Sequence, residues 1–296
     1  MAFKTSTKAI YQGARADGEP YGLSDAPWNT QTYDLWTQHA GRAPTILHWG
    51  QPFGALDTNA LNIAKTRGAV SLISVDFPVD SINSGSLDAT IDAFAAKCKA
   101  WGYPILLRPG WEMNGTWFGW GRKSGFVAAW RRYVSRIRAI APNVSFVWCP
   151  NTIWDSASDP APYFPGEAYV DWVGIDGYNR AEPWHSPYEV FKATYDRLRL
   201  LAPNRPMMIC ETGCVENGGN KAAWLTNLLT KALPERFPAV KALIWFNWNI
   251  FEKNRTWEWP IESSSASQAA YKAGLALPYY SAVPNFTLGA KLRVPA

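Results

Sequence analysis

The segment Tyr103-Pro-Ile-Leu-Leu-Arg-Pro-Gly-Trp-Glu-Met-Asn-Gly-Thr-Trp-Phe-Gly-Trp-Gly121 joins a short apolar run to a loop of polar and aromatic residues. The run predicts a buried strand over Tyr103–Pro109, so we expect Glu112 to lie where this strand ends and a loop opens. Aromatic rings stack on sugar rings, and short amides such as that of Asn114 bond hydroxyls. The composition therefore indicates a sugar-binding loop; a structural loop with a solvated glutamate is the alternative.

Eight such apolar segments recur along the chain, at intervals that leave room for a helix between them. Several are almost continuous in Val, Ile, Leu and Met, which is typical of parallel strands covered on both faces. We expect strands at Ala9–Ala16, Pro44–Gly50, Gly68–Asp76, Tyr103–Pro109, Val144–Asn151, Val170–Tyr178, Pro206–Thr212 and Val240–Trp248.

Helical patterns separate these segments. One amphipathic pattern ends at Gly102, another opens at Ser124, and Ser186-Pro-Tyr-Glu189 is a capping box with proline at the first helical position. Alternating strands and helices without a linker predict a single-domain (β/α)8 barrel over residues 1–277, with an extension, 278–296, packing on it. A doubly wound open sheet is the alternative.

The composition narrows the class of protein. The chain has 296 residues, 47% of them hydrophobic, and its 17 tryptophans exceed what one core needs, so some should face a ligand. The net charge of +5 is spread over scattered lysines and arginines, so we expect no nucleic-acid surface. No apolar run is long enough to span a membrane and no signal peptide is visible. We therefore expect a soluble chain, and we expect a monomer; its basic balance would fit an anionic partner in a cell wall.

The four cysteines, Cys98, Cys149, Cys210 and Cys214, lack zinc or redox spacing, so we expect free buried thiols. Neither a dinucleotide-binding glycine pattern nor a phosphate-binding loop is present, so we expect no metal and no cofactor.

In a (β/α)8 barrel the working residues follow the carboxyl ends of the strands. Those ends carry polar and aromatic side chains: His48, Arg108, Glu112, Asp176, Tyr178, Glu211, Trp245 and Trp248. Asp176 would orient Tyr178 or a sugar hydroxyl, or form a salt bridge inside the barrel. His48 would line the sugar site, or be a hydrogen-bonded residue of the rim.

Glu112 and Glu211 differ from the rest because each ends a run otherwise too apolar for a charge. Strands four and seven face each other across the barrel mouth, so we expect the two carboxyls to meet there. Glycosidic hydrolysis needs such a pair, about 5–5.5 Å apart in a retaining enzyme. For Glu211, an ion pair with an arginine such as Arg108 is the alternative.

Three motifs, Arg108-Pro…Glu112-Met-Asn-Gly115, Asp171-Trp-Val-Gly-Ile-Asp-Gly-Tyr-Asn179 and Glu211-Thr-Gly213, resemble glycoside hydrolase family 26. The best-known members of that family of retaining (β/α)8 glycosidases are endo-β-1,4-mannanases. The resemblance implies that Glu112 is the general acid/base and Glu211 the nucleophile. It also implies that Tyr178 lies near the nucleophile, and that the rings of Trp117 and Trp120 form an aromatic wall.

One position departs from the family pattern. Mannanases of the family usually carry a histidine immediately before the acid/base, where this chain has Trp111. A tryptophan stacks and donates through one N–H, so the reaction type is better supported than the sugar. We expect a retaining, endo-acting β-glycoside hydrolase of a mannan-type or related cell-wall β-glycan. The alternatives are a catalytically inactive carbohydrate-binding barrel and a transglycosylase that uses the same site.

Overall fold

The computed structural model describes residues 9–16, 30–252 and 255–295. Eight parallel strands form a closed barrel, because β1 pairs with both β2 and β8. The prediction of a (β/α)8 barrel is confirmed, and the open-sheet alternative is wrong. The strands are β1 Tyr11–Arg15, β2 Ile46–Gln51, β3 Val70–Val75, β4 Ile105–Pro109, β5 Val144–Trp148, β6 Trp172–Asn179, β7 Met207–Cys214 and β8 Val240–Phe246.

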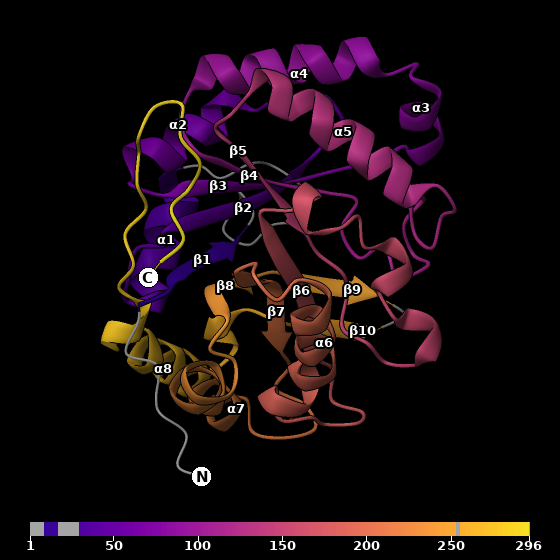
Figure 1. Cartoon of the computed structure of the whole chain (residues 1–296). Helices are drawn as coiled ribbons and strands as arrows, with labels where there is room; N and C mark the ends of the chain where they lie inside the picture. The colour runs from indigo at the N-terminus through magenta and orange to yellow at the C-terminus, as the bar shows by residue number, and fades with distance from the viewer. Residues whose placement is uncertain (1–8, 17–29, 253–254, 296) are drawn as a thin grey trace.

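Helices surround the strands (Figure 1). They are α1 Thr30–Ala40, α2 Thr58–Thr66, α3 Val79–Ser84, α4 Asp88–Trp101, α5 Phe126–Ile140, α6 Pro187–Leu201, α7 Lys221–Asn227 and α8 Ser265–Leu275. A π-helical stretch, Leu228–Arg236, continues α7, and a hairpin of β9 Asn249–Glu252 and β10 Arg255–Glu258 follows β8. Within the described ranges, no helix is long and apolar enough to cross a membrane.

Both faces of the strands are buried, which explains their continuous apolar runs. In β3, for example, Val70 and Leu72 face the inside of the barrel, while Ile73 and Val75 join the outer core under the helices. Successive side chains alternate between the two faces. This alternation places every second residue at a strand end in the mouth of the barrel.

The helix ends follow local sequence chemistry. The predicted capping box is present at α6, where Ser186 Oγ accepts from the Glu189 N–H at 3.3 Å and Glu189 Oε2 accepts from the Ser186 N–H at 2.7 Å. The predicted end of α4 at Gly102 is also confirmed, with φ of 77°. The predicted start of α5 is wrong by one residue: Gly125, with φ of 82°, precedes the helix in place of Ser124. Glycine adopts this left-handed conformation without strain.

The last residues pack against the end of the barrel opposite the mouth. Leu292 is buried in the inner cluster beside Tyr11, whose hydroxyl donates to the Arg293 carbonyl at 2.7 Å. Ile10 donates its N–H to the Tyr279 carbonyl at 2.7 Å. These contacts lie at the amino-terminal ends of the strands, so they leave the mouth open.

Candidate active site

Arg108 lies at the centre of the barrel mouth. It follows Leu106 on the inner face of β4, so strand alternation points its side chain inward, where it is fully buried. Nη1 donates to both carboxylate oxygens of Asp176 at 2.8 Å, and Nε donates to Ser74 Oγ at 2.7 Å. Nη2 donates to Glu211 Oε1. Burial alone would lower the pKa of Arg108, but Asp176 and Glu211 outweigh it and hold that pKa well above its ordinary value. The guanidinium therefore stays charged.

An irregularity in β7 turns Glu211 toward this arginine. Ile175 of β6 lies opposite Ile209, but the next residue, Asp176, lies opposite Glu211, so β7 contains one extra residue at Cys210. Such bulges re-aim side chains and are frequent beside active sites. Cys210 belongs to the inner cluster, and the carboxylate of Glu211 also faces the inside of the barrel.

Glu211 is held in its ionised form. Its second oxygen, Oε2, accepts from the Tyr178 hydroxyl at 2.7 Å, and Arg15 Nη1 lies 3.6 Å from Oε1. Burial raises the pKa of Glu211, but the charges of Arg108 and Arg15 and the Tyr178 hydrogen bond together lower it below its ordinary value. An ionised carboxylate fixed at both oxygens suits nucleophilic attack.

Glu112 has the opposite electrostatic environment. Its backbone φ is 53°, in the left-handed region, and its N–H donates to the Cys149 carbonyl at 2.7 Å. Oε1 accepts from Asn151 Nδ2 at 2.6 Å, and Oε2 accepts from Trp117 Nε1. Burial raises the pKa of Glu112 and the negative charge of Glu211 raises it further, while Asn151, Trp117 and Arg108 act in the other direction. The net rise favours a protonated carboxyl, as a general acid requires.

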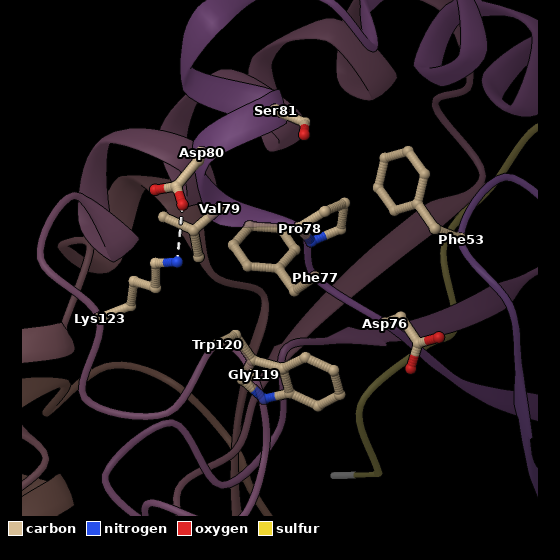
Figure 2. A pocket seen from close by; sticks show the side chains of 10 residues that line it. All are labelled: Phe53, Asp76, Phe77, Pro78, Val79, Asp80, Ser81, Gly119, Trp120 and Lys123. Carbon is tan, nitrogen blue, oxygen red and sulfur yellow. Dashed lines mark ion pairs between the residues drawn. The ribbon is translucent and has the colours of Figure 1, made fainter.

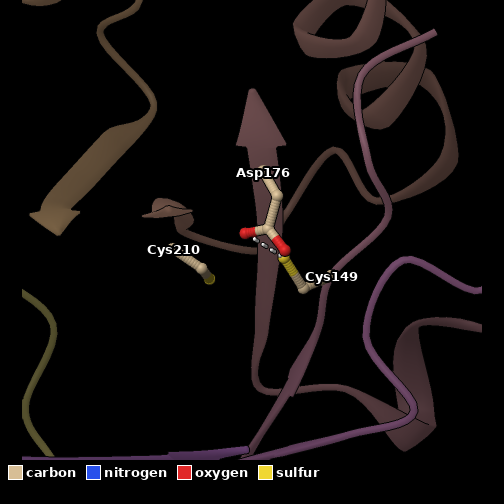
Figure 3. A group of neighbouring side chains, drawn as sticks. All are labelled: Cys149, Asp176 and Cys210. Atoms are coloured by element: carbon tan, nitrogen blue, oxygen red, sulfur yellow. Dashed lines mark hydrogen bonds between the residues drawn. The ribbon is translucent and has the colours of Figure 1, made fainter. Parts of the chain in front are cut away.

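The two glutamates are close together. One carboxylate oxygen each of Glu112, Asp176 and Glu211 lies within 4.8 Å of the other two. Asp176 also belongs to a second buried group, with Cys149 and Cys210 (Figure 3), in which Cys149 Sγ lies 3.2 Å from Asp176 Oδ1. Burial raises the pKa of Asp176 well above its ordinary value, and the ion pair with Arg108 acts in the other direction. The prediction of four free buried cysteines is confirmed.

Residues 29–227 match the family described as Glycosyl hydrolase family 26. The chain belongs to this family.

Two curated relatives match this family 26 chain over different lengths. It is 32% identical over 258 residues to Endoglucanase H of Acetivibrio thermocellus, a match of 79% of this chain and 28% of the relative. It is 27% identical over 183 residues to the mannan endo-1,4-β-mannosidase of Bacillus subtilis strain 168, a match of 57% of this chain and 44% of the relative. The chain thus spans less than half the length of these relatives.

The fold also matches solved structures. The catalytic domain of the family 26 endo-β-1,4-mannanase from Bacillus sp. JAMB-750 superposes with a TM-score of 0.68. That alignment covers 94% of this chain and 88% of the solved chain at 17% identity. At this identity, the likeness supports the barrel fold alone.

Trp117, which donates to Glu112, and its neighbour Trp154 are both exposed. Trp117 is 50% exposed and Trp154 is 49% exposed, and their ring centroids lie 5.4 Å apart. Trp111 is half-buried, with the Arg108 guanidinium 5.5 Å from its ring centroid. Trp248, also half-buried, lies 5.7 Å from the Arg15 guanidinium on the β8 side. The predicted sugar contacts Trp111, Trp117, Tyr178 and Trp248 therefore all retain exposed surface, and Trp154, which was not predicted, lies beside Trp117.

Two predicted sugar contacts, Asn114 and Trp245, are corrected by their placement. The side-chain oxygen of Asn114 accepts from the Asn151 N–H, and its NH2 group donates to the carbonyls of Asn151 and Ser158, so the buried amide is fully used in joining the loops after β4 and β5. Trp245 alternates to the outer face of β8 and packs on Tyr271 of α8. Trp120 is 7% exposed and lines a pocket together with Phe53 and Asp76, so its predicted place in an aromatic wall stays a prediction.

Three more predicted contacts lie beneath the surface of the site. Arg108, Asp176 and His48 are fully buried, so they position Glu211 and have no surface for a sugar. Of the two roles considered for Asp176, the salt bridge with Arg108 is the one observed. His48 Nε2 lies 2.8 Å from Ser74 Oγ and 3.2 Å from Arg108 Nη2. Burial lowers the pKa of His48 well below its ordinary value, and Arg108 lowers it further, so the ring is neutral.

A pocket of about 540 Å³ lies between the loops that follow β2, β3 and β4 (Figure 2). Its walls include Phe53, Asp76 and the edge of Trp120, and an ion pair of 2.6 Å joins Asp80 to Lys123. The indole N–H of Trp120 donates to the Trp111 carbonyl at 2.7 Å, which fixes this ring in the wall of the pocket.

Four residues of the site are missing from the sequence-based prediction: Arg15, Ser74, Asn151 and Trp154. Strand alternation could have identified the first two, since each lies in step with inward-facing apolar residues of β1 and β3. Asn151 and Trp154 lie in the loop after β5, and no sequence period sets the direction of loop side chains.

Proposed function

We propose that this chain is a retaining, endo-acting β-glycoside hydrolase that works by double displacement. The observation that supports it is the pair of buried glutamates, with carboxylate oxygens within 4.8 Å of each other and pKa values shifted in opposite directions. That separation suits a retaining mechanism, because an inverting enzyme needs about 6.5–9.5 Å to admit a water molecule.

In the first step, a carboxylate oxygen of Glu211 forms a bond to the anomeric carbon while the bond from that carbon to the leaving oxygen breaks. Glu112 transfers its proton to the leaving oxygen. In the second step, Glu112, now ionised, takes a proton from water as the water oxygen attacks the anomeric carbon. The bond to Glu211 breaks, the sugar leaves with its original anomeric configuration, and both glutamates return to their starting states.

The proposed substrate is a mannan-type or related cell-wall β-glycan. The relatives support this class, since one carries the name of an endoglucanase and another that of a mannan endo-1,4-β-mannosidase. Exposed rings at Trp117 and Trp154 suit a chain of sugars that extends beyond the cleaved bond. Because Trp111 replaces the histidine that is usual in mannanases of the family, the proposed substrates include both gluco- and manno-configured backbones.

Two alternatives share the same site. A carbohydrate-binding barrel without catalysis does not require two carboxylates, each held by two or more donors. A transglycosylase would use the same residues and differ only in whether water or an acceptor sugar takes the glycosyl group.

The proposal is tested by incubating the chain with mannan, glucomannan, lichenan and xylan. Reducing ends would be counted, product lengths followed by chromatography, and the first-formed anomer recorded by proton NMR. We expect internal cleavage and β-configured products from at least one polymer, with Glu211→Gln as the inactive control. Binding without cleavage would identify a binding barrel, and an excess of products longer than the added oligosaccharide would identify a transglycosylase.

A further inference from the structure

Lys221 is a buried cation that the proposed chemistry does not use. It is the first residue of α7 and is 1% exposed. Its ammonium donates to the carbonyls of Glu258 at 2.8 Å and Pro260 at 2.7 Å, and to Ser263 Oγ at 2.7 Å. The Trp259 carbonyl lies 3.3 Å away. All four acceptors belong to the segment that leads from β10 into the short helix Ile261–Ser263.

Placing the Lys221 ammonium here is unfavourable for folding, which indicates that this charge has a specific role. A positive charge at the first position of a helix lies at the unfavourable end of the helix dipole. Burial lowers the pKa of Lys221 to about 8, although Glu216 and Cys214 act to raise it. The group remains protonated at neutral pH, with three N–H bonds to donate. A neutral side chain of this length could not satisfy as many carbonyls.

The segment that Lys221 holds supports the nucleophile. Trp259 is 1% exposed, and its ring lies 4.9 Å from the ring of Tyr178. The space beside it is full, because a side chain at Gly213 would meet the Trp259 ring at 2.8 Å. Tyr178 in turn donates to Glu211 Oε2 at 2.7 Å. A continuous set of contacts thus runs from Lys221 through Trp259 and Tyr178 to Glu211.

Three other groups hold the same segment. Glu216 Oε1 accepts from Ser263 Oγ at 2.7 Å, at the end of the segment. Trp245 Nε1 donates to the Trp259 carbonyl at 3.0 Å, and Asn247 Oδ1 accepts from the Ile261 N–H at 2.8 Å. None of the three reaches the carbonyls of Glu258 and Pro260, which flank Trp259 on both sides. Lys221 therefore fixes the backbone on either side of this ring.

We propose that Lys221 is a positioning residue for the nucleophile: its ammonium holds residues 258–263 so that Trp259 supports Tyr178 and keeps the Tyr178 hydroxyl on Glu211. The inference rests on the proposed function, because it assigns Glu211 as the nucleophile. Lys221 itself touches no reacting atom.

The central test compares Lys221→Met, Tyr178→Phe and the double variant through the pH dependence of kcat/KM. The Tyr178 hydrogen bond lowers the pKa of Glu211, so losing it should move the acidic limb to higher pH. We expect Lys221→Met to move this limb in the same direction and to lower kcat/KM by about tenfold, within the range for a misplaced catalytic group. The double variant should be no worse than Tyr178→Phe alone, because both act through one contact.

Tyr280→Phe is the matched control for a lost buried hydrogen bond. The Tyr280 hydroxyl donates to the Leu229 carbonyl at 2.8 Å, away from the two glutamates. This variant should lower Tm without moving the acidic limb. The positioning role is wrong if Lys221→Met, like Tyr280→Phe, lowers Tm without moving the acidic limb. It is also wrong if the losses of kcat/KM in Lys221→Met and Tyr178→Phe multiply in the double variant.

Two further measurements keep the inference testable. If Lys221→Met does not fold, Trp259→Phe takes its place, and an unchanged acidic limb in that variant overturns the inference. If the wild-type chain hydrolyses no β-glycan, the proposed function fails, but the hold on the segment can still be measured by amide hydrogen exchange. Amide exchange over residues 257–263 should become faster in Lys221→Met and stay unchanged in Tyr280→Phe. If exchange is equal in both variants, Lys221 does not hold this segment.

Discussion

Asn151 donates from Nδ2 to Glu112 Oε1 at 2.6 Å, so the loop after β5 holds the carboxyl that follows β4. The Asn151 backbone is fixed in turn by Asn114, whose side-chain oxygen accepts from the Asn151 N–H at 2.9 Å. Asn114 therefore acts on the proposed acid through Asn151, although it contacts no sugar.

The first prediction concerns pH. Glu211 must be ionised to attack, and its pKa is lowered from 4.5, so the acidic limb of kcat/KM should lie below pH 4.5. Glu112 must carry its proton, and its pKa is raised from 4.5, so the alkaline limb should lie above that value. We expect a bell-shaped profile when kcat/KM is measured between about pH 3 and pH 9.

Asn151→Ala provides the control for this assignment. The Asn151 hydrogen bond lowers the pKa of Glu112, so removing it should move the alkaline limb upward and leave the acidic limb in place. Movement of the acidic limb alone would mean that the roles of the two glutamates are exchanged.

The second prediction separates the two glutamates by chemical rescue. Glu112→Ala should reduce turnover by about 10²–10⁴-fold through the loss of acid/base catalysis, and Glu211→Ala should reduce it at least as much. Azide can attack in place of Glu211 and should give a glycosyl azide of inverted configuration. In Glu112→Ala, azide should attack the glycosyl-enzyme and give the retained configuration. Proton NMR of the glycosyl azides distinguishes the two configurations. Near-normal activity in either alanine variant would contradict the assignment.

The barrel could be predicted because each of its strands leaves a strong signal in the sequence. Runs such as Val70–Val75 and Met207–Cys214 are too apolar for a surface, and polar residues follow them at the mouth. Glu112 and Glu211 could be chosen for the same reason, since a charge at the end of such a run requires a compensating environment.

The sugar contacts were harder to predict because strand-end residues alternate in direction. Trp245 and Phe246 are adjacent in β8, but Trp245 packs under the helices while Phe246 faces the mouth. In loops no such rule applies. The identity of Asn114 as an amide does not reveal that both of its ends are used within the protein, and Trp154 has no neighbouring motif that would mark it.

The third prediction concerns Trp154. Its backbone is fixed, because its N–H donates to Ser158 Oγ at 2.9 Å, although half of its side chain is exposed. A rigid, exposed ring beside Trp117 suits stacking against a sugar on the leaving-group side of Glu112. Trp154→Ala should lower kcat/KM on a polysaccharide by about tenfold, a typical loss for one contact.

Two comparisons test this role. An aryl glycoside with an activated leaving group places no sugar on that side, so its hydrolysis by Trp154→Ala should equal that of the wild type. Tyr188→Ala removes another partly exposed ring, on α6, and should leave kcat/KM unchanged for both substrates. Equal losses on the polysaccharide and the aryl glycoside would show that Trp154 acts on the fold of the site and not on the substrate.

The last prediction concerns Trp111, where the chain departs from the family pattern. Its ring is wedged among Phe118 and Trp120, each with a centroid distance of 4.8 Å, and it lies over Arg108. Trp111→His would replace a flat apolar surface with a ring that can donate and accept hydrogen bonds. Such a change in one contact shifts substrate preference by about 1–3 kcal/mol, or roughly 10- to 200-fold in kcat/KM. We expect the ratio of mannan to glucan hydrolysis to rise, with both polymers assayed in parallel.

Trp111→Phe controls for the loss of the indole, because it removes that ring without adding a polar atom. A wild-type chain that already prefers linear mannan, combined with an unchanged ratio in Trp111→His, would show that this position serves packing alone.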